Sequence, residues 1–338
     1  MTVSGSIPAL FALPAAAMVS AALVWAIRPM LLRHALARPN ARSSHRIPTP
    51  QGAGVAVMAA TLVVCCGIAV WGGDAELTIP LAVFGAALFM AMVGFADDVK
   101  SIDVLPRLLL QAAAVAAILL AAPGDLRIVP ACPLWVERGI LLLAGLWFVN
   151  LVNFMDGLDW MTVAEVVPIT AALVLLGLLD RFPVSATLVA AALCGALLGF
   201  APFNRPVAKV FLGDVGSLPI GLLLGWCLLQ LAYRQQFAAV LLLPLYYLLD
   251  ATVTLLRRLA RREPFWAAHR SHFYQRATDN GFTVWRVVGE VFALNILLAA
   301  LAVGSIMAAS AAIKIVLLLA GGVATALVMY RFSQRRAA

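Results

Sequence analysis

The chain has 338 residues, of which 64% are hydrophobic and only 12% are charged, and its mean hydropathy is +1.00. A soluble domain carries about 25% charged residues, so this composition leaves too little polar surface to coat a water-soluble globule. The formal net charge of +8 does not indicate a nucleic-acid-binding protein, because the basic residues lie between apolar segments, where membrane topology explains them.

Apolar segments long enough to cross a bilayer as helices recur along the whole chain. We therefore predict a single all-α domain over residues 1–338, a polytopic membrane bundle of about eleven transmembrane helices. The first segment has no basic residues before it, so we expect a retained span rather than a cleaved signal peptide. The expected spans are 7–28, 53–72, 78–96, 104–122, 138–154, 161–179, 184–202, 216–233, 236–256, 284–309 and 311–331.

The basic residues between these spans predict the orientation. Most arginines and lysines fall in one of two alternating sets of loops, and positive charge is enriched on the cytoplasmic side of membrane proteins. We expect the N-terminus outside and the C-terminus in the cytoplasm. The loops expected on the cytoplasmic side are about 29–52, 97–104, 153–161, 203–217 and 257–284.

Five polar clusters lie at span ends, and this topology brings all of them to the cytoplasmic side. The first runs from Ser43 to Gly54 and contains His45; its two prolines fix an extended turn, although an ordinary loop would look the same.

The second is Asp97-Asp98 with Lys100 nearby. Adjacent carboxylates are costly near hydrocarbon unless a cation or a transferable proton accompanies them. One could bind a proton while the other orients a basic group or a metal; the alternative is a solvated helix end.

The third cluster places Asn150, Asn153, Asp156 and Asp159 at every third position. In a helix the first three form one slowly drifting stripe of oxygen ligands. Such ligands suit Mg²⁺ and not zinc or copper. The alternative is hydrogen bonding between helices, which explains one or two asparagines better than the whole set.

The fourth cluster begins at Asn204 and ends in Gly213-Asp214-Val-Gly-Ser217, a tight turn before a helix. The amides of that helix start could bind a phosphate; the alternative is a plain N-cap by Asp214 or Ser217. The fifth cluster is His269-Arg270-Ser-His272-Phe-Tyr274-Gln275-Arg276. Arginine forks match phosphate oxygens, whereas a basic loop facing lipid headgroups is the alternative. That alternative fits the arginines at 257, 258, 261 and 262 better than it fits the histidines.

Together the clusters supply carboxylates, amides, histidines and arginines, without a P-loop or a serine–histidine–aspartate pattern. Carboxylates with Mg²⁺ and cationic side chains are the usual equipment for handling a diphosphate. A location at a membrane face implies one lipid substrate and one soluble phosphate compound.

In this order the clusters resemble the motifs of the polyprenyl-phosphate N-acetylhexosamine-1-phosphate transferase superfamily. This superfamily includes the phospho-N-acetylmuramoyl-pentapeptide transferases and the enzymes that start O-antigen and teichoic-acid lipid intermediates. The resemblance covers about residues 43–276. The matching pieces are HRIPTP, GFADDV, NLVNFMDGLD, FLGDVGS and HRSHFYQR.

The resemblance implies that a UDP sugar gives its sugar 1-phosphate to undecaprenyl phosphate, with release of UMP. It implies inline attack without a covalent intermediate, Mg²⁺ as cofactor with Mn²⁺ as an alternative ion, and a site facing the cytoplasm in the bacterial inner membrane. The implied partners are undecaprenyl phosphate, a UDP-N-acetylhexosamine and membrane lipid, with no nucleic acid; a homodimer stays open.

The resemblance also implies residue roles. Asp97 and Asp98 match the acidic pair, one of which is the base for the lipid phosphate, and Asn153 and Asp214 match positions that hold Mg²⁺. The positions implied for substrate binding are His45, Lys100, Arg107, Asp156, Asp159, Asn204, His269, Arg270 and His272.

The sequence also departs from the family pattern. Gln51-Gly-Ala-Gly54 replaces Pro-Arg-Gly-Gly, Trp160 follows Asp159 where glycine is frequent, and either Arg107 or Lys100 takes the place of a frequent lysine. Two histidines separated by Arg-Ser favour the O-antigen-initiating branch. The alternatives are the muramoyl-pentapeptide branch, an inactive scaffold, and a transporter, for which the carboxylates of Asp250 and Glu290 lie inside or near spans.

Overall fold

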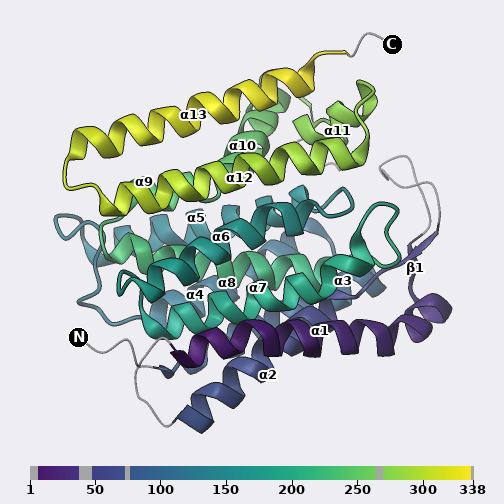
Figure 1. The fold of residues 1–338 in the computed structure, drawn as a ribbon, viewed down its shortest axis with the longest axis horizontal. Coiled ribbons are helices and arrows are strands. Elements are labelled where there is room, and N and C mark those ends of the chain that lie inside the picture. The colour runs from purple at the N-terminus through teal and green to yellow at the C-terminus, as the bar shows by residue number, and fades with distance from the viewer. Residues whose placement is uncertain (1–6, 38–47, 73–76, 264–268, 336–338) are drawn as a thin grey trace.

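The structure is a computed structural model that describes residues 7–37, 48–72, 77–263 and 269–335. Within these residues, ten helices are long and apolar enough to cross a membrane, which confirms the predicted polytopic helical bundle (Figure 1). They are α1 (Ile7–His34), α2 (Gly54–Gly72), α3 (Leu81–Val99), α4 (Val104–Ala121), α5 (Leu134–Met155), α6 (Met161–Leu178), α7 (Val184–Asn204), α8 (Asp214–Tyr233), α12 (Val284–Met307) and α13 (Ala311–Ser333).

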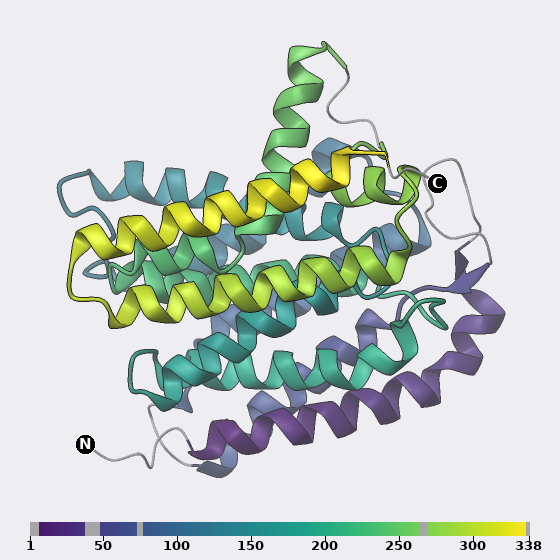
Figure 2. The same ribbon diagram turned by 45° about the horizontal axis from the view of Figure 1, so that its top comes forward.

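The predicted span 236–256 is not one helix. It is divided into α9 (Phe237–Leu242) and α10 (Leu245–Ala260), and the short helix α11 (Phe273–Asp279) follows. The break falls at Pro244, which lacks the N–H that would continue the hydrogen-bond ladder of α9. After this break α10 projects away from the rest of the bundle (Figure 2).

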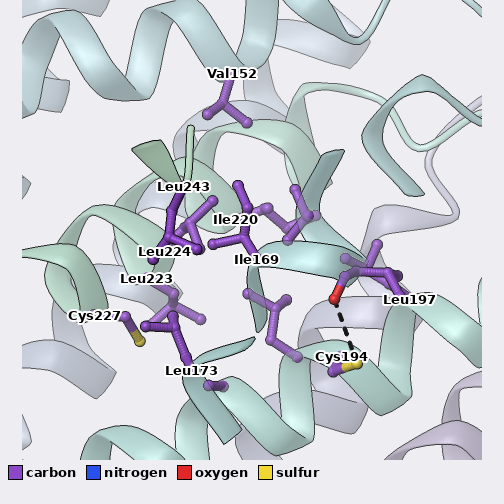
Figure 3. Packing of buried hydrophobic residues seen from close by; sticks show 14 of the residues in the cluster. Val152, Ile169, Leu173, Cys194, Leu197, Ile220, Leu223, Leu224, Cys227 and Leu243 are labelled. Carbon is purple, nitrogen blue, oxygen red and sulfur yellow. Dashed lines mark hydrogen bonds between the residues drawn. The ribbon is translucent and has the colours of Figure 1, made fainter. Parts of the chain in front are cut away.

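The bundle is layered around α6, α7 and α8, most of whose residues are buried. Figure 3 shows part of this core, in which Cys194 and Cys227 pack as small apolar residues among leucines and isoleucines. In contrast, α1 and α13 expose large apolar side chains such as Trp25 and Leu319. The exposed apolar surface lies on the outer helices, as expected where the solvent is lipid. Helix α1 begins and α13 ends at opposite ends of the bundle (Figure 1).

Glycines let the helices approach closely at two places. On α7, Gly195 and Gly199 face the backbone of α1, where an added Cβ would lie 2.0 Å from Leu13 O and 2.2 Å from Ala17 O. This is the small-xxx-small packing that membrane helices use. On α3, a Cβ at Gly94 would lie 2.2 Å from Asp214 O, so α3 is pressed against the first turn of α8.

A short antiparallel pair joins two loops at the same end of the bundle. Strand β1 (Leu36–Ala37) pairs with β2 (Thr49–Pro50). Beyond β2 the chain bonds to the loop before α8, since Phe211 N donates to Pro50 O at 2.8 Å and Gly54 N donates to Leu212 O at 2.8 Å. The first predicted cluster is therefore fastened to the fourth.

We expect Gly94→Ala to lower the free energy of unfolding by about 1–3 kcal/mol, the usual cost of overpacking. The added methyl would meet backbone atoms of Asp214, which cannot move aside as a flexible side chain would. Thermal unfolding in detergent measures the effect. Gly85→Ala on the same helix is the matched control, because nothing lies within 4 Å of its Cβ position. Equal destabilisation by both substitutions would contradict the close approach of α3 and α8.

Candidate functional site

A cavity of about 650 Å³ opens at the end of the bundle where α5 and α7 end and α8 begins. We call it the main cavity. Phe211 and Trp285 contribute aromatic surface to its wall. The polar side chains that line it come from four of the five predicted clusters: Thr49, Gln51, Asn153, Asp156, Asp159, Asn204, Asp214 and Gln275.

Asn153 and Asp214 are in direct contact in this cavity. Asn153 Nδ2 lies 2.8 Å from Asp214 Oδ1 and 2.8 Å from Ser217 Oγ. The two residues are 61 positions apart in sequence, at the last turn of α5 and the first residue of α8. The structure therefore brings together the two residues to which the family resemblance assigns a metal ion.

Asp98 caps the N-terminus of α8 from α3. Its carboxylate accepts hydrogen bonds from Asp214 N and Val215 N, both at 3.0 Å, and from Gln51 Nε2 at 2.6 Å. Gly213 adopts a φ of 78°, and a Cβ there would lie 2.6 Å from Asp98 Oδ2, so glycine makes room for the cap. A carboxylate at a helix N-terminus is favoured by the helix dipole.

This cap changes two expectations about the start of α8. The N-cap position is Gly213, and the capping carboxylate comes from Asp98 rather than from Asp214 or Ser217. The first amides of the helix are also occupied, since Gly216 N and Ser217 N bond to Gly213 O at 3.0 Å. They are therefore not available to a phosphate as the sequence suggested.

Asp97 is paired differently from Asp98. Its carboxylate lies 2.8 Å from Arg107 Nη1 and accepts from Ile102 N at 2.6 Å. It also lies close to the Asp214 carboxyl. Of the two basic candidates, Arg107 is the one that pairs with this carboxylate, whereas Lys100 ends α3, with its N–H bonded to Ala96 O.

Asp159 and Asn204 hold the wall of the main cavity. Asp159 Oδ2 accepts from Ala208 N at 2.9 Å. Asn204 is buried; its Oδ1 accepts from Trp160 N at 2.8 Å and its Nδ2 donates to Val210 O at 3.0 Å. Asn204 thus connects the turn after α5 to the loop after α7.

Trp160 occupies a backbone conformation that usually favours glycine. Its φ is 67°, which costs a non-glycine residue about 1 kcal/mol or more. Three contacts offset this cost: the bond to Asn204, a bond from Trp160 Nε1 to Ala201 O at 2.7 Å, and an edge-on contact with Trp285 at 5.4 Å between ring centroids. Trp160, which stands where the family often has glycine, is therefore stabilised in this conformation in part by its contact with Trp285.

The histidine cluster packs around Asp250 instead of lining the main cavity. His272 is buried, with Nδ1 3.1 Å from Asp250 Oδ1, and Asp250 also accepts from Phe273 N and Tyr274 N at the start of α11. Burial lowers the pKa of His269 to about 4, helped by His272 and Arg258, so His269 is neutral at pH 7. Arg270 pairs with Asp279 at 3.3 Å.

Sequence reasoning missed several residues of the site. Gln51, Gln275 and Trp285 line the main cavity, and Asp250 organises α11. Gln275 lies within the motif HRSHFYQR, so its place in the sequence could have indicated that it belongs to the site. His45 falls outside the described residues.

The acidic residues fit a magnesium ion that is shared with a substrate. Within the described ranges, no three His, Cys, Asp or Glu side chains converge closely enough to hold a metal. Mg²⁺ is usually bound by one or two carboxylates together with substrate phosphates, so a complete protein cage is not required. Asp214, with the Asn153 amide and Asp97 beside it, is a donor set of this kind.

Comparisons with known proteins identify relatives of this chain. Residues 80–232 match the family described as Glycosyl transferase family 4, and this segment contains Asp97, Asn153 and Asp214. The chain is 30% identical over 320 residues to the decaprenyl-phosphate N-acetylglucosaminephosphotransferase of Mycolicibacterium smegmatis, covering 83% of this chain and 77% of that protein.

Two further relatives are named phospho-N-acetylmuramoyl-pentapeptide-transferase. The one from Mycobacterium sp. is 30% identical over 240 residues, which cover 57% of this chain and 66% of that protein. The one from Streptococcus pyogenes is 36% identical over 111 residues, or 32% of either chain. The chain thus spans just under two thirds of the length of the Mycobacterium relative.

Asp156 gives a prediction about pH. Burial raises its pKa from 3.8 to about 7, and the carboxylates of Asp98 and Asp159 add to the rise, while a hydrogen bond from Thr162 lowers it. Because the folded state favours the protonated carboxyl, this group stabilises the fold below about pH 4, and that contribution is lost as pH rises to about 7.

In the wild type, the free energy of unfolding should fall with rising pH by at most about 1.4 kcal/mol per pH unit because of this group. We therefore expect this pH dependence to be absent in Asp156→Asn. Unfolding in detergent with EDTA between pH 4 and 8 measures it. Asp125→Asn, at an exposed loop position, is the control and should keep the wild-type slope. An unchanged slope in Asp156→Asn would show that the buried carboxyl does not titrate in this range.

Proposed function

The chain belongs to the polyprenyl-phosphate N-acetylhexosamine-1-phosphate transferase superfamily, and from this membership we propose a specific reaction. The enzyme transfers an N-acetylhexosamine 1-phosphate from a UDP sugar to undecaprenyl phosphate. UMP is released, and an undecaprenyl-diphosphate sugar forms at the cytoplasmic face of the bacterial inner membrane. This product initiates a cell-envelope polysaccharide of the O-antigen type.

The contact between Asn153 and Asp214 is the observation that carries this proposal. The Asn153 amide nitrogen donates to the Asp214 carboxylate at 2.8 Å, which brings two side chains from distant helices together beside Asp97, in a cavity at the end of a membrane bundle. Such a site can bind a divalent ion and a diphosphate together while a lipid reaches it from the bilayer.

We assign Mg²⁺ to Asn153 and Asp214, with Mn²⁺ as an alternative ion. The ion would neutralise charge on the diphosphate and on the leaving UMP. Asp98, already bonded to three donors, positions α8 and its Asp214. Asp97 is the better candidate for the base, because its carboxyl faces Asp214 and Arg107 holds it in place.

In the proposed reaction a phosphate oxygen of the lipid attacks the phosphorus attached to the sugar. Its new bond forms as the bond from that phosphorus to the bridging oxygen breaks, and the bridging oxygen leaves with UMP. Asp97 takes up the proton when the lipid phosphate arrives as the monoanion. The chain's contribution is positioning and charge stabilisation, as in other phosphoryl transfers.

The coverage of the relatives favours an N-acetylhexosamine donor. The match to the N-acetylglucosaminephosphotransferase extends over 83% of this chain, against 57% for the Mycobacterium muramoyl-pentapeptide transferase. A transporter receives no support from Asp250 or Glu290, the two acids that suggested one. Asp250 caps α11, and Glu290 forms ion pairs with Arg286 at 2.9 Å and Arg331 at 3.3 Å.

We expect Asp214→Ala to reduce transfer by at least about a hundredfold while the protein still folds and inserts into the membrane. The assay offers purified protein a radiolabelled UDP-N-acetylglucosamine, undecaprenyl phosphate and Mg²⁺, and scores the lipid product. Asp125→Asn, at the opposite end of the bundle, should leave turnover unchanged. Normal turnover in Asp214→Ala would remove the metal assignment.

A panel of UDP sugars tests the donor. We expect an N-acetylhexosamine donor such as UDP-N-acetylglucosamine or UDP-N-acetylfucosamine to give lipid product, and UDP-N-acetylmuramoyl-pentapeptide to give none. Product from the pentapeptide donor alone would place the chain in the muramoyl branch.

A further inference from the structure

A second polar cavity, of about 320 Å³, lies between the C-terminal end of α10 and the start of α11. Its lining includes Thr254, Glu263 and Ser271. The remaining lining residues form what we call the arginine cluster: Arg257, Arg258, Arg261, Arg270 and Arg276. We propose that this cluster binds a phosphate group, that of an anionic membrane lipid, at a site separate from the main cavity.

The charge of this cavity requires a counter-ion. Among the described residues that line it are five arginines and one carboxylate, Glu263, which lies 3.6 Å from Arg258. Asp279 pairs with Arg270 but does not line the cavity. Like charges held this close repel one another, and a bound anion relieves that repulsion. Guanidinium forks also match the oxygens of a phosphate.

The cluster is held in place before any ligand arrives. The guanidinium groups of Arg257 and Arg276 lie 5.2 and 5.9 Å from the centroid of the same Phe273 ring. Phe273 is itself buried, and its N–H is bonded to Asp250. Two of the five arginines are thereby positioned on a fixed aromatic support.

The place of α10 in the fold favours a lipid as the source of the phosphate. The helix projects from the bundle (Figure 2), and its last turns expose Leu256 and Leu259 on the face opposite the cluster arginines. A helix with one apolar and one basic face lies at the membrane interface, where anionic headgroups gather. The phosphate of such a lipid reaches the arginines at the depth where the leucines enter the acyl region.

The site is distinct from the main cavity but connected to it through α11. The two cavities share no lining residue. However, Gln275 lines the main cavity and the next residue, Arg276, lines the second one. A lipid bound to the cluster therefore steadies the helix that supplies part of the substrate wall.

Lipid binding can be measured without any assumption about the reaction. Phosphatidylglycerol is titrated into the detergent-purified full chain, and the thermal unfolding temperature is followed in wild type, Arg257→Gln/Arg261→Gln and Arg262→Gln. Arg262 is the matched control, because it is exposed on the same segment but does not line the cavity. We expect the half-maximal lipid concentration to rise about tenfold or more in the double variant and to stay unchanged in the control.

Two outcomes would overturn the proposal. An equal response of all three proteins to the lipid would mean that the cluster is not the binding site, as would an equal loss in Arg262→Gln. A parallel titration with inorganic phosphate and with UMP separates the sources. If either soluble compound gives the same stabilisation, dependent on Arg257 and Arg261, the lipid assignment fails. Because no substrate turns over in these titrations, their result is independent of the transfer assay.

Discussion

The hydrogen bonds from the start of α8 to Asp98 are the interaction on which the site depends. Asp98 is 116 residues from Asp214 in sequence, yet its carboxylate fixes the first turn of the helix that begins with Asp214. Gly94, one turn earlier on α3, allows the backbones to come close enough for this contact. A membrane helix bundle has few polar contacts, so one charged cap between two helices has a large influence on their relative position.

The same constraint explains why the adjacent residues Asp97 and Asp98 have different partners. Asp98 turns toward the amides of α8, and Asp97 turns toward Arg107 and Asp214. Two adjacent carboxylates near hydrocarbon repel each other unless positive or hydrogen-bond-donating groups accompany them. Here each meets a separate set of donors, and only one of them is directed at the carboxyl assigned to the metal.

Much of this architecture could be predicted from the sequence, because apolar length is a direct consequence of bilayer thickness. The region around Pro244 was harder, since apolar residues continue on both sides of the proline and hide the break between α9 and α10. The pairing of Asn153 with Asp214 was implied by the resemblance to the family, and the topology placed both residues on the same side of the membrane. The cap by Asp98 did not, because no local pattern specifies which carboxylate will meet a helix start. Asp250 looked like an isolated acid for the same reason: its donors are backbone amides of α11.

The left-handed turn at Trp160 has a consequence for substrate entry. Trp160 connects three segments of the cavity wall, because its indole donates to Ala201 O and packs edge-on against Trp285, while its backbone N–H donates to Asn204. A glycine in this place would leave the turn free to sample other shapes, and an incoming nucleotide would have to select among them. The contacts of Trp160 hold the turn in one conformation before the ligand binds, so less of the binding free energy is lost in ordering the cavity wall.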